Sequence, residues 1–425
     1  LFLILVLFYV LFNDLTLDKV TLDIIKRRFF DELKSAFKNQ SSCLGCYNTH
    51  IYLPPKNPKE SYFLAIDLGG SNLRVAICKR FKDKIDIISI TKEPLDVKLM
   101  TTNVTFLFEF IAECCVSIIK KYNIQQDISV GFTFSFRVEQ HSKVRSTVKQ
   151  WNKGYLLAIN FDPAMELERL FHLKGFEQIK VDCLINDTTA TLLTNYFYDN
   201  CCDVGLILGT GSNMCLAVPK LALNDDLFDD NYEKLIFNLE SGNYNVDLPR
   251  TTIDDILDKH SLNPSIQFEE KMVAGLYLGE LVSLSLLEYF NEKEYVLNWE
   301  KKDYLDSETI GQFQFSSHDD IYIYFKTLLN LELSRDDIEM VQRLCRLITS
   351  RSAQIAAALV AGAITFLTSL DSKQHNIGID GSLYRIHPGY KELFETTVCD
   401  LLSDIPFTVS FLTQDNASLI GSALV

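Results

Sequence analysis

The segment at residues 67–72 reads Asp-Leu-Gly-Gly-Ser-Asn, so a carboxylate stands directly before a glycine-rich turn. Backbone amides in such a turn can approach phosphate oxygens without a Cβ in the way, and their dipoles favour negative charge. Asp67 could then hold a metal-bound water beside the phosphates. For an isolated aspartate before two glycines, a simple capping role in the turn is the more frequent case.

A second carboxylate, Asp187, follows the apolar run 183–185 and precedes a helical pattern. A carboxylate at such a strand end points into a cleft, where it could accept the proton of a hydroxyl that attacks phosphorus. The three residues Asn186, Asp187 and Thr188 also suit an ordinary helix N-cap, and the residues alone favour that cap.

The glycine turn has a second copy in the chain. Aligning Ile66 with Ile207, an offset of 141 positions, superposes the Gly-Ser-Asn of residues 70–72 on that of residues 211–213. The offset is about one domain, so the repeat indicates either a duplication or a coincidence between two short turns. Two such turns that face one cleft could hold both ends of a triphosphate. The chain has no P-loop string and no protein-kinase motif.

Other polar residues are suited to a polyhydroxyl ligand. Thr133 and Ser135 alternate with aromatic residues, so we expect them to share one face of a strand, although sheet packing explains the pattern equally well. Residues 151–155 set an amide and a cation between two aromatic rings, with a surface turn as the alternative. Glu240 and the pair at residues 269–270 could each accept two hydroxyls or merely be solvated.

The sequence pattern predicts a mixture of helices and strands that would position these residues. We expect strands over 62–67 and 73–78 around the first turn, and a similar pair within 204–218 around the second. Helical spacing predicts helices over 14–38, 105–122, 271–289 and 350–367. No low-complexity linker divides the chain, so we expect two lobes that pack closely across a hinge near Asn200.

Composition excludes several function classes. A net charge of −15 would repel nucleic acid and acidic membrane surfaces, so we expect neither as a partner. Eleven cysteines in a chain of 425 residues are typical of reduced thiols in the cytoplasm, although Cys43, Cys46 and His50 offer three potential zinc ligands. The apolar residues 1–12 fall short of the ~20 that span a bilayer, so we interpret them as a fragment edge, with an anchor as the alternative.

Taken in order, these segments resemble the hexokinase family over about residues 15–424. The resemblance is carried by residues 63–75 (FLAIDLGGSNLRV), 131–136 (GFTFSF), 185–188 (INDT), 209–213 (GTGSN), 248–252 (LPRTT) and 379–382 (IDGS). It implies an α/β fold with two lobes of the actin-like ATPase type. Each lobe would be a mixed, ribonuclease-H-like sheet with flanking helices, and a cleft would lie between the lobes.

The resemblance also implies an organisation of the chain and a set of site residues. The expected divisions are an apolar segment 1–13, a helical segment 14–61 on the large lobe, a small lobe 62–199, a large lobe 200–412 and a return to the small lobe at 413–425. Asp187 would be the catalytic base. Sugar contacts would come from Ser135, Asn152, Lys153, Asn186, Asp187, Asn213, Glu240 and Glu270. Nucleotide and phosphate contacts would come from Asp67, Gly69, Gly70, Ser71, Asn72, Arg74, Gly209, Thr210, Gly211, Asp380, Gly381 and Ser382.

The implied activity is ATP-dependent phosphorylation of the 6-hydroxyl of a hexose, in glycolysis or hexose metabolism. The cofactors would be ATP and the Mg²⁺ carried on its phosphates, with no direct protein ligand and a water-mediated contact to Asp67. We expect a cytoplasmic monomer or homodimer whose partners are the sugar and ATP.

Three departures from the family pattern concern the sugar pocket, and a fourth concerns the nucleotide site. Arg137 stands where proline is usual, and Asn152 replaces a threonine. Ser241 follows Glu240 in place of a large ring, and residues 415–418 lack the usual glycines. A smaller side chain beside Glu240 suggests a roomier pocket, so a kinase of N-acetylglucosamine is one alternative. A non-catalytic sugar sensor of the same fold is the other.

Overall fold

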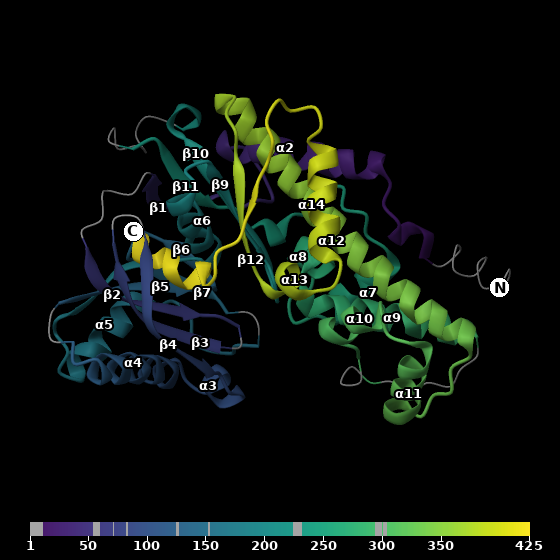
Figure 1. Cartoon of the computed structure of the whole chain (residues 1–425), viewed down its shortest axis with the longest axis horizontal. Coiled ribbons are helices and arrows are strands. Elements are labelled where there is room, and N and C mark those ends of the chain that lie inside the picture. The colour runs from purple at the N-terminus through teal and green to yellow at the C-terminus, as the bar shows by residue number, and fades with distance from the viewer. Residues whose placement is uncertain are drawn as a thin grey trace.

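The computed structural model describes residues 12–53, 60–70, 72–81, 84–124, 127–151, 154–223, 232–293, 300 and 304–425. Two β-sheets with flanking helices lie side by side, and the chain ends beside the first of them (Figure 1). The apolar N-terminal residues 1–11 lie outside the described part of the chain.

The first sheet has the strand order β4-β3-β2-β5-β8. Its strands are β2 (Ser61–Leu68), β3 (Asn72–Arg80), β4 (Ile85–Pro94), β5 (Ile128–Phe134) and β8 (Ile179–Ile185). The pair β2–β3 is antiparallel, while β5 runs parallel to both β2 and β8. The hairpin β6 (Arg137–Gln140) and β7 (Ser146–Gln150) forms a separate two-stranded sheet after β5.

The second sheet has the order β1-β11-β10-β9-β12-β13. Its strands are β1 (Tyr47–Leu53), β9 (Cys202–Leu208), β10 (Ser212–Pro219), β11 (Lys234–Asn238), β12 (Asn376–Asp380) and β13 (Phe411–Leu412). The antiparallel pair β9–β10 repeats the pair β2–β3, and each encloses one of the two glycine turns. The expected strand-turn-strand repeat is therefore present in both sheets.

The helices cover the sheets and connect them. Around the first sheet they are α3 (Val97–Thr101), α4 (Val104–Lys121) and α5 (Pro163–Leu173). The others are α2 (Lys19–Phe37), α6 (Asp187–Tyr198), α7 (Thr252–His260), α8 (Phe268–Val273), α9 (Gly275–Glu292), α10 (Ser307–Phe313), α11 (His318–Leu329), α12 (Arg335–Asp371), α13 (Ser382–Ile386), α14 (Tyr390–Leu401) and α15 (Ala417–Ile420). Helix α6 begins where β8 ends and packs on β9 and β12 of the second sheet.

The helix predicted over 271–289 is wrong in one respect, because two helices occupy that stretch. Ala274 between α8 and α9 is extended, with ψ 144°. The Gly275 and Leu276 amides donate instead to the carbonyls of Gly209 (2.9 Å) and Thr210 (3.2 Å). The start of α9 is thereby joined to the second glycine turn, a contact that helical periodicity does not reveal.

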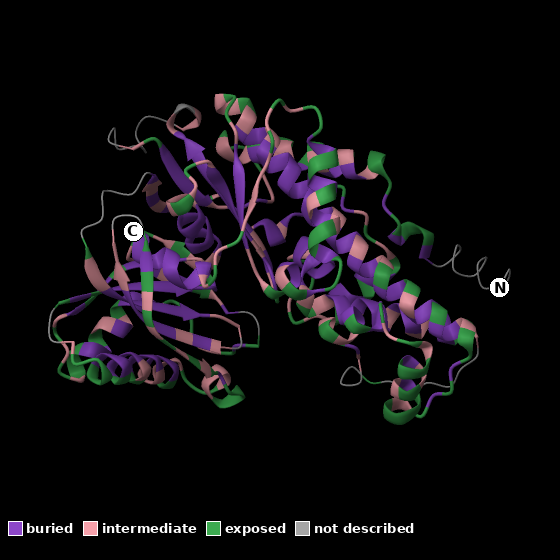
Figure 2. Cartoon of the chain, in the orientation of Figure 1, coloured by how far each residue is buried: buried purple, intermediate pink, exposed green. Residues whose placement is uncertain are grey.

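Helix α12 is the longest helix of the described chain, and purple buried residues alternate along it with pink and green ones in Figure 2. It packs on α2 and α14, and a Cβ at Gly362 would stand 3.2 Å from Phe29 Cβ. Among the described helices only α12 is long and apolar enough to cross a bilayer, and 72% of its most apolar window is buried within the protein. Packing in the core accounts for its apolar character.

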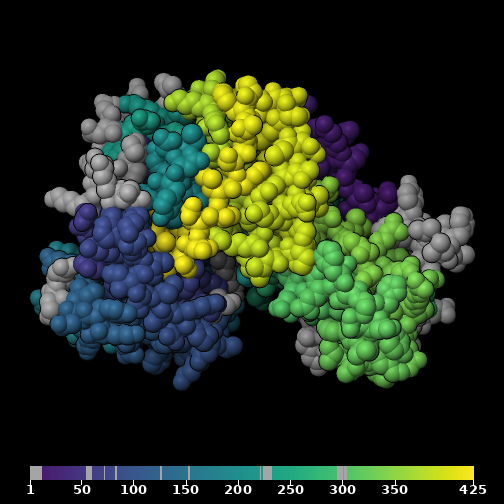
Figure 3. Space-filling view, in the orientation of Figure 1, coloured from purple at the N-terminus to yellow at the C-terminus, as the bar shows by residue number. Residues whose placement is uncertain are grey.

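The C-terminal segment returns to the first sheet. Helix α15 and the following 3₁₀ turn (Gly421–Leu424) contact β2, β5, β8 and α6. In Figure 3 the C-terminal part of the chain fills the space between the blue and green masses, which are separated by a hollow along the lower edge. One cluster of buried apolar side chains includes residues of both sheets, α6 and the C-terminal segment, so the sheets pack closely.

Of the two explanations for the alternation of Thr133 and Ser135 with aromatic residues, sheet packing is the one that applies to Thr133. Thr133 is fully buried, and its hydroxyl donates to the Ser418 carbonyl at 2.7 Å. A Cβ at Gly131, on the same strand, would overlap the backbone of Ser422. Strand β5 lies inside its sheet, the C-terminal segment packs against it, and its residues 130–134 are all buried.

Candidate functional site

Asp187 is the first residue of α6 and lines a small cavity. The N-cap interpretation is confirmed for Asn186, whose Oδ1 accepts from the Thr188 amide at 2.9 Å and from the Thr188 hydroxyl at 2.7 Å. Asp187 Oδ1 also accepts from the Thr188 amide at 2.9 Å. The cap therefore holds Asn186 and Asp187 at the end of β8, where the positive end of the helix favours a carboxylate.

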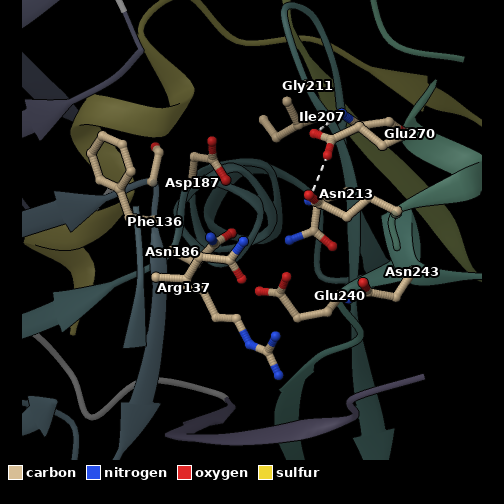
Figure 4. Close-up of a pocket in the computed structure, with 15 residues that line it drawn as sticks. Phe136, Arg137, Asn186, Asp187, Ile207, Gly211, Asn213, Glu240, Asn243 and Glu270 are labelled. Atoms are coloured by element: carbon tan, nitrogen blue, oxygen red, sulfur yellow. Dashed lines mark hydrogen bonds between the residues drawn. The ribbon is translucent and has the colours of Figure 1, made fainter. Parts of the chain in front are cut away.

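The cavity around Asp187 has a volume of about 50 Å³. In Figure 4 the polar ends of Asn186, Asn213, Glu240 and Glu270 converge on the space beside Asp187 from different elements. Ser135 lines it too, and its amide donates to the Leu68 carbonyl at 3.3 Å. Carboxylates accept hydroxyl hydrogens and amides donate as well as accept, so the lining suits a ligand with many hydroxyl groups.

A chain of amide hydrogen bonds orients Glu240. Asn213 Nδ2 donates to Asn238 Oδ1 at 2.9 Å, and Asn238 Nδ2 donates to Glu240 Oε1 at 2.8 Å. Glu240 itself has a left-handed backbone, with φ 50° and ψ 48°. Ser241, in contrast, is buried, and its amide donates to Asn213 Oδ1 at 3.1 Å. Ser241 does not line the cavity, whereas the next two residues, Gly242 and Asn243, do.

Glu270 is held from two sides. The Ser212 amide donates to Glu270 Oε1 at 3.3 Å, and Gln267 Nε2 donates to Glu270 Oε2 at 2.6 Å. A Cβ at Gly242 would lie 3.1 Å from Glu270 Cβ and 3.2 Å from the Ser212 carbonyl oxygen. A side chain at position 242 would therefore require Glu270 or Ser212 to shift by a few tenths of an ångström.

The second glycine turn forms part of the wall of two cavities. Gly211 lines the cavity at Asp187, whereas Gly209 and Thr210 line a larger cavity of about 990 Å³. The turn is closed by the Gly209 amide, which donates to the Gly211 carbonyl at 3.0 Å. Gly381 packs against it with φ 119°, and a Cβ there would overlap the Leu208 carbonyl.

The larger cavity combines apolar and polar side chains of α9, α10, α13 and the loops beside them. Exposed Leu276 and Ile386 contribute apolar surface, and Ser382 lies at its edge. His387 also lines it, and burial lowers the pKa of His387 to about 4, so its imidazole is neutral at physiological pH. Glu280, Asp306 and Glu308 line it as well, so the wall combines apolar surface with hydrogen-bond acceptors.

The first glycine turn lies beside a buried ion pair. The Gly69 amide donates to the Asn72 carbonyl at 3.1 Å. Arg74 pairs with buried Asp67 and also donates to Ser418 Oγ at 2.6 Å. Burial lowers the pKa of Arg74, but the charges of Asp67, Asp380 and Asp187 outweigh it and leave that pKa raised. Asp187 is therefore close enough to act on the charge of Arg74.

The structure brings together only part of the predicted set in each cavity. Ser135, Asn186, Asp187, Gly211, Asn213, Glu240 and Glu270 line the smaller cavity, and Gly209, Thr210 and Ser382 line the larger one. Asp67, Gly69, Gly70, Asn72, Arg74, Asp380 and Gly381 lie outside both linings. Three further candidates, Ser71, Asn152 and Lys153, lie outside the described residues.

The two aromatic residues that flank positions 152 and 153, Trp151 and Tyr155, do not lie on the surface of the protein. Both are buried, and they stack on each other with ring centroids 5.4 Å apart. Both also contact the Phe136 ring with centroids 4.7 Å apart, so they belong to an aromatic core cluster. The Tyr155 hydroxyl donates to the Gly69 carbonyl at 3.1 Å, which ties this cluster to the first glycine turn.

Several lining residues were not predicted. Gln150, Asn243 and Gln267 line the smaller cavity, and their residue types carried no signal of it. Arg137 lines it as well, and its Nη2 donates to the Tyr47 hydroxyl at 3.0 Å across the gap between β6 and β1. The proline expected at position 137 was the only sequence signal there. Within the described residues no group of three His, Cys, Asp or Glu side chains is placed to hold a metal ion.

Two family models, both described as hexokinase, match residues 9–197 and 203–425. Hexokinase-7 of Oryza sativa subsp. japonica is 31% identical over 400 residues, which cover 87% of this chain and 85% of that protein. Hexokinase-1 of Mus musculus is 30% identical over 436 residues, 96% of this chain but 44% of that protein. The chain thus spans about half the length of the mammalian relatives.

Two solved structures share the fold. A hexokinase from Schistosoma mansoni, complexed with glucose, superposes with a TM-score of 0.86 at 23% identity and covers 99% of this chain and 98% of that one. A glucokinase of the ROK family from Streptomyces griseus, in complex with glucose and AMPPNP, has a TM-score of 0.50 at 14% identity over 85% of this chain and 98% of that one. The expected two-lobed, actin-like architecture is confirmed.

Proposed function

The chain belongs to the hexokinase family, and we propose that it transfers the terminal phosphoryl group of ATP to the 6-hydroxyl of a hexose. One observation carries the proposal: the turn at residues 209–211 forms part of the wall of both cavities. A nucleotide in the larger cavity would lay its phosphates along this turn towards Asp187. The glucose and AMPPNP in the solved relatives support the same pair of ligands for this chain.

Asp187 would act as the general base. It would take the proton of the 6-hydroxyl while that oxygen bonds to the γ-phosphorus, and the bond from phosphorus to the bridging oxygen of ADP would break. Glu240 and Glu270 would accept hydrogens from other sugar hydroxyls. The amide of Asn213 already uses its oxygen and one of its hydrogens within the protein, which leaves one hydrogen for the sugar.

Mg²⁺ carried on ATP would neutralise part of the phosphate charge as it builds up on ADP. Asp67 would hold a water of that ion rather than the ion itself, because its carboxylate is buried and already bonded to Arg74 and Ser418. Arg74 would stay cationic beside the phosphates, consistent with its raised pKa. We further propose a cytoplasmic monomer or homodimer, in line with eleven free cysteines.

The test is ADP release by the purified full chain with glucose, fructose, mannose and N-acetylglucosamine. Asp187→Asn should lower kcat about 10²- to 10⁴-fold while sugar binding, measured by calorimetry, is retained. Asp182→Asn is the matched control, because Asp182 is an exposed aspartate of the same strand, β8, outside the lining of the cavity. It should leave both quantities unchanged.

Two outcomes would favour the alternatives. Sugar binding without ADP release in the parent protein would identify a sensor. A higher kcat/KM for N-acetylglucosamine than for glucose would identify a kinase of that sugar. The buried position of Ser241 gives the second alternative no extra room in the cavity wall, so we expect glucose to be preferred.

A further inference from the structure

A buried carboxyl, that of Glu269, lies directly behind the sugar cavity. Glu269 is 1% exposed and precedes Glu270 in α8. Its Oε1 accepts a hydrogen bond of 3.0 Å from Ser212 Oγ, whereas its Oε2 has no hydrogen-bond partner among the described residues. An ionised carboxylate with one oxygen buried and unpaired is costly, so this arrangement requires an explanation.

The groups that face Glu269 favour its neutral form. Burial raises the pKa of Glu269 to about 8, the Ser212 hydrogen bond opposes that rise in part, and the charge of Glu270 adds to it. Tyr390 of α14 is also close, because an ionised Glu269 would raise the pKa of that phenol. The described neighbours that act on the charge of Glu269 thus include a second carboxylate, a serine and a tyrosine.

Tyr390 does not supply the missing hydrogen bond. Its hydroxyl lies 3.0 Å from Ser352 Oγ, and Ser352 Oγ donates to the Val273 carbonyl at 2.7 Å. Because the Ser352 hydrogen is used in that bond, the Tyr390 hydroxyl donates to Ser352. Among the described residues, the carboxyl of Glu269 therefore forms its side-chain hydrogen bond with Ser212, on the cavity side.

Ser212 is the junction between the two parts of the site. Its amide donates to Glu270 at 3.3 Å and its hydroxyl donates to Glu269 at 3.0 Å, so two neighbouring carboxyls hold one residue. The same residue directly follows the turn 209–211 and begins β10. A displacement of Ser212 would move the sugar-binding Glu270 and the phosphate turn together.

We propose that Glu269 is a positioning residue that keeps a proton in the working enzyme and, through Ser212, holds the phosphate turn in register with Glu270. The inference rests on the proposed function of the cavity. In the neutral carboxyl Oε1 still accepts the hydrogen bond from Ser212 Oγ, and the unpaired Oε2 belongs to an uncharged group rather than to a carboxylate. Loss of that proton places a second negative charge next to Glu270, and the repulsion between the two carboxylates would displace Ser212, which both of them contact.

The first test is the pH profile of kcat/KM for glucose in the parent protein, Glu269→Gln and Glu269→Leu. The parent should lose activity as the pH rises through about 8, the pKa of Glu269. Glu269→Gln cannot ionise and keeps an oxygen that accepts from Ser212, so it should stay within about fivefold of the parent at pH 7 and lack that alkaline decline. Glu269→Leu should lose about tenfold at every pH, mainly through KM, because the hydrogen bond is absent.

Glu288→Gln serves as the matched control. Glu288 lies on α9, burial also raises its pKa, and it is outside the lining of both cavities. Its substitution should leave the profile of the parent unchanged. An alkaline decline that persists in Glu269→Gln, or equal behaviour of Glu269→Gln and Glu269→Leu, would overturn the proposal.

The second test needs no catalysis. Because the folded pKa of Glu269 is raised from 4.5 to about 8, the folded chain binds more protons than the unfolded chain between those values, and stability falls as the pH rises through that window. The melting temperature of Glu269→Gln minus that of the parent should therefore increase from about pH 4.5 to about pH 8. Above about pH 8 this difference should stay constant. A difference in melting temperature that does not change with pH would refute the proposal that Glu269 is protonated in the folded chain.

The two tests separate this inference from the proposed function. The parent could phosphorylate no sugar while the difference in melting temperature between Glu269→Gln and the parent still increases with pH. The proposed function would then be wrong, whereas the protonation of Glu269 would be supported. Glucose affinity measured by calorimetry then replaces kcat/KM in the first test. An affinity that is independent of pH in the parent would then reject the positioning role.

Discussion

Arg74 donates a hydrogen bond of 2.6 Å to Ser418 Oγ, although 344 positions of the chain separate the two residues. Ser418 Oγ in turn donates to Asp67 Oδ2 at 3.2 Å, and Arg74 pairs with the same carboxylate. The C-terminal segment is thus fastened to the two strands that enclose the first glycine turn. Asn416 takes part as well, with a left-handed backbone and its Oδ1 3.4 Å from Arg74 Nη1.

Ser418→Ala should therefore weaken the nucleotide end of the site. Loss of a hydrogen bond to a buried ion pair is worth about 1.5–3 kcal/mol, so KM for ATP should rise by at least about tenfold, with KM for glucose within twofold. Steady-state kinetics with each substrate varied would show this. Ser422→Ala is the control, since that hydroxyl donates to the Leu419 carbonyl at 3.1 Å. Equal effects of the two substitutions would contradict the role of Ser418.

Arg137→Ala should impair sugar binding rather than turnover. Arg137 lines the smaller cavity and is steadied there by the Tyr47 hydroxyl. We expect KM for glucose to rise by about tenfold with kcat within twofold, and Tyr47→Phe to raise it by about threefold. Arg145→Ala is the control, because Arg145 pairs with Glu168 at 3.3 Å away from the cavity. An Arg137→Ala protein with unchanged KM would disprove the contribution.

Gly381→Ala should disrupt the contact between β12 and the second glycine turn. Its φ is 119° and a Cβ would overlap the Leu208 carbonyl, so both strain and collision oppose a side chain. We expect a loss of stability above about 3 kcal/mol and loss of ATP use. Gly175→Ala is matched in its positive φ of 80° but meets no described atom within 4 Å, so it should cost only about 1 kcal/mol. Urea unfolding of both proteins would show whether the collision of the Cβ or the positive φ makes the larger contribution to the loss of stability.

Asp254→Asn should destabilise the core around α12. Asp254 accepts bonds of 2.7 and 2.8 Å from Arg351, which is fully buried, and it also caps α7 through the Thr251 amide at 2.8 Å. Breaking a buried pair leaves a charge without compensation and costs about 3–5 kcal/mol. Asp255→Asn, which removes an exposed partner of Arg250, should cost less than about 1 kcal/mol. Comparable losses in the two variants would argue against a buried pair.

The same pair makes acid stability depend on Asp254. Burial raises the pKa of Asp254, but the charge and hydrogen bonds of Arg351 outweigh it, and the pKa lies below 3.8. A lowered folded pKa contributes stability above 3.8 that is lost as the pH falls through the lowered value. Melting temperatures between about pH 2 and 6 should therefore fall less steeply in Asp254→Asn than in the parent. Parallel curves would show that this carboxyl does not titrate on unfolding.

Local chemistry explains what could be predicted before the fold was known. The two strand-turn-strand copies follow from apolar runs interrupted by glycines, and the end of β8 at Asn186 follows from a residue that caps a helix. Asp187 beside that cap was recognisable as a candidate base for the same reason. Each of these features depends on neighbours within a few positions of the chain.

Non-local contacts explain what was missed. The helix expected over 271–289 breaks because the turn at residues 209–210 accepts the first amides of α9. Thr133 is buried because the C-terminal segment covers its strand, and Trp151 stacks in a core that sequence spacing does not display.

The sequence by itself therefore determined the strand pairs around the two glycine turns and the position of Asp187 at the end of a strand. Only the tertiary structure decided which of these residues share a cavity, that one turn serves two cavities, and that Glu269 lies buried behind Ser212. The physical reason is that propensity and capping act over a few residues, whereas burial and charge depend on every segment that packs around a side chain.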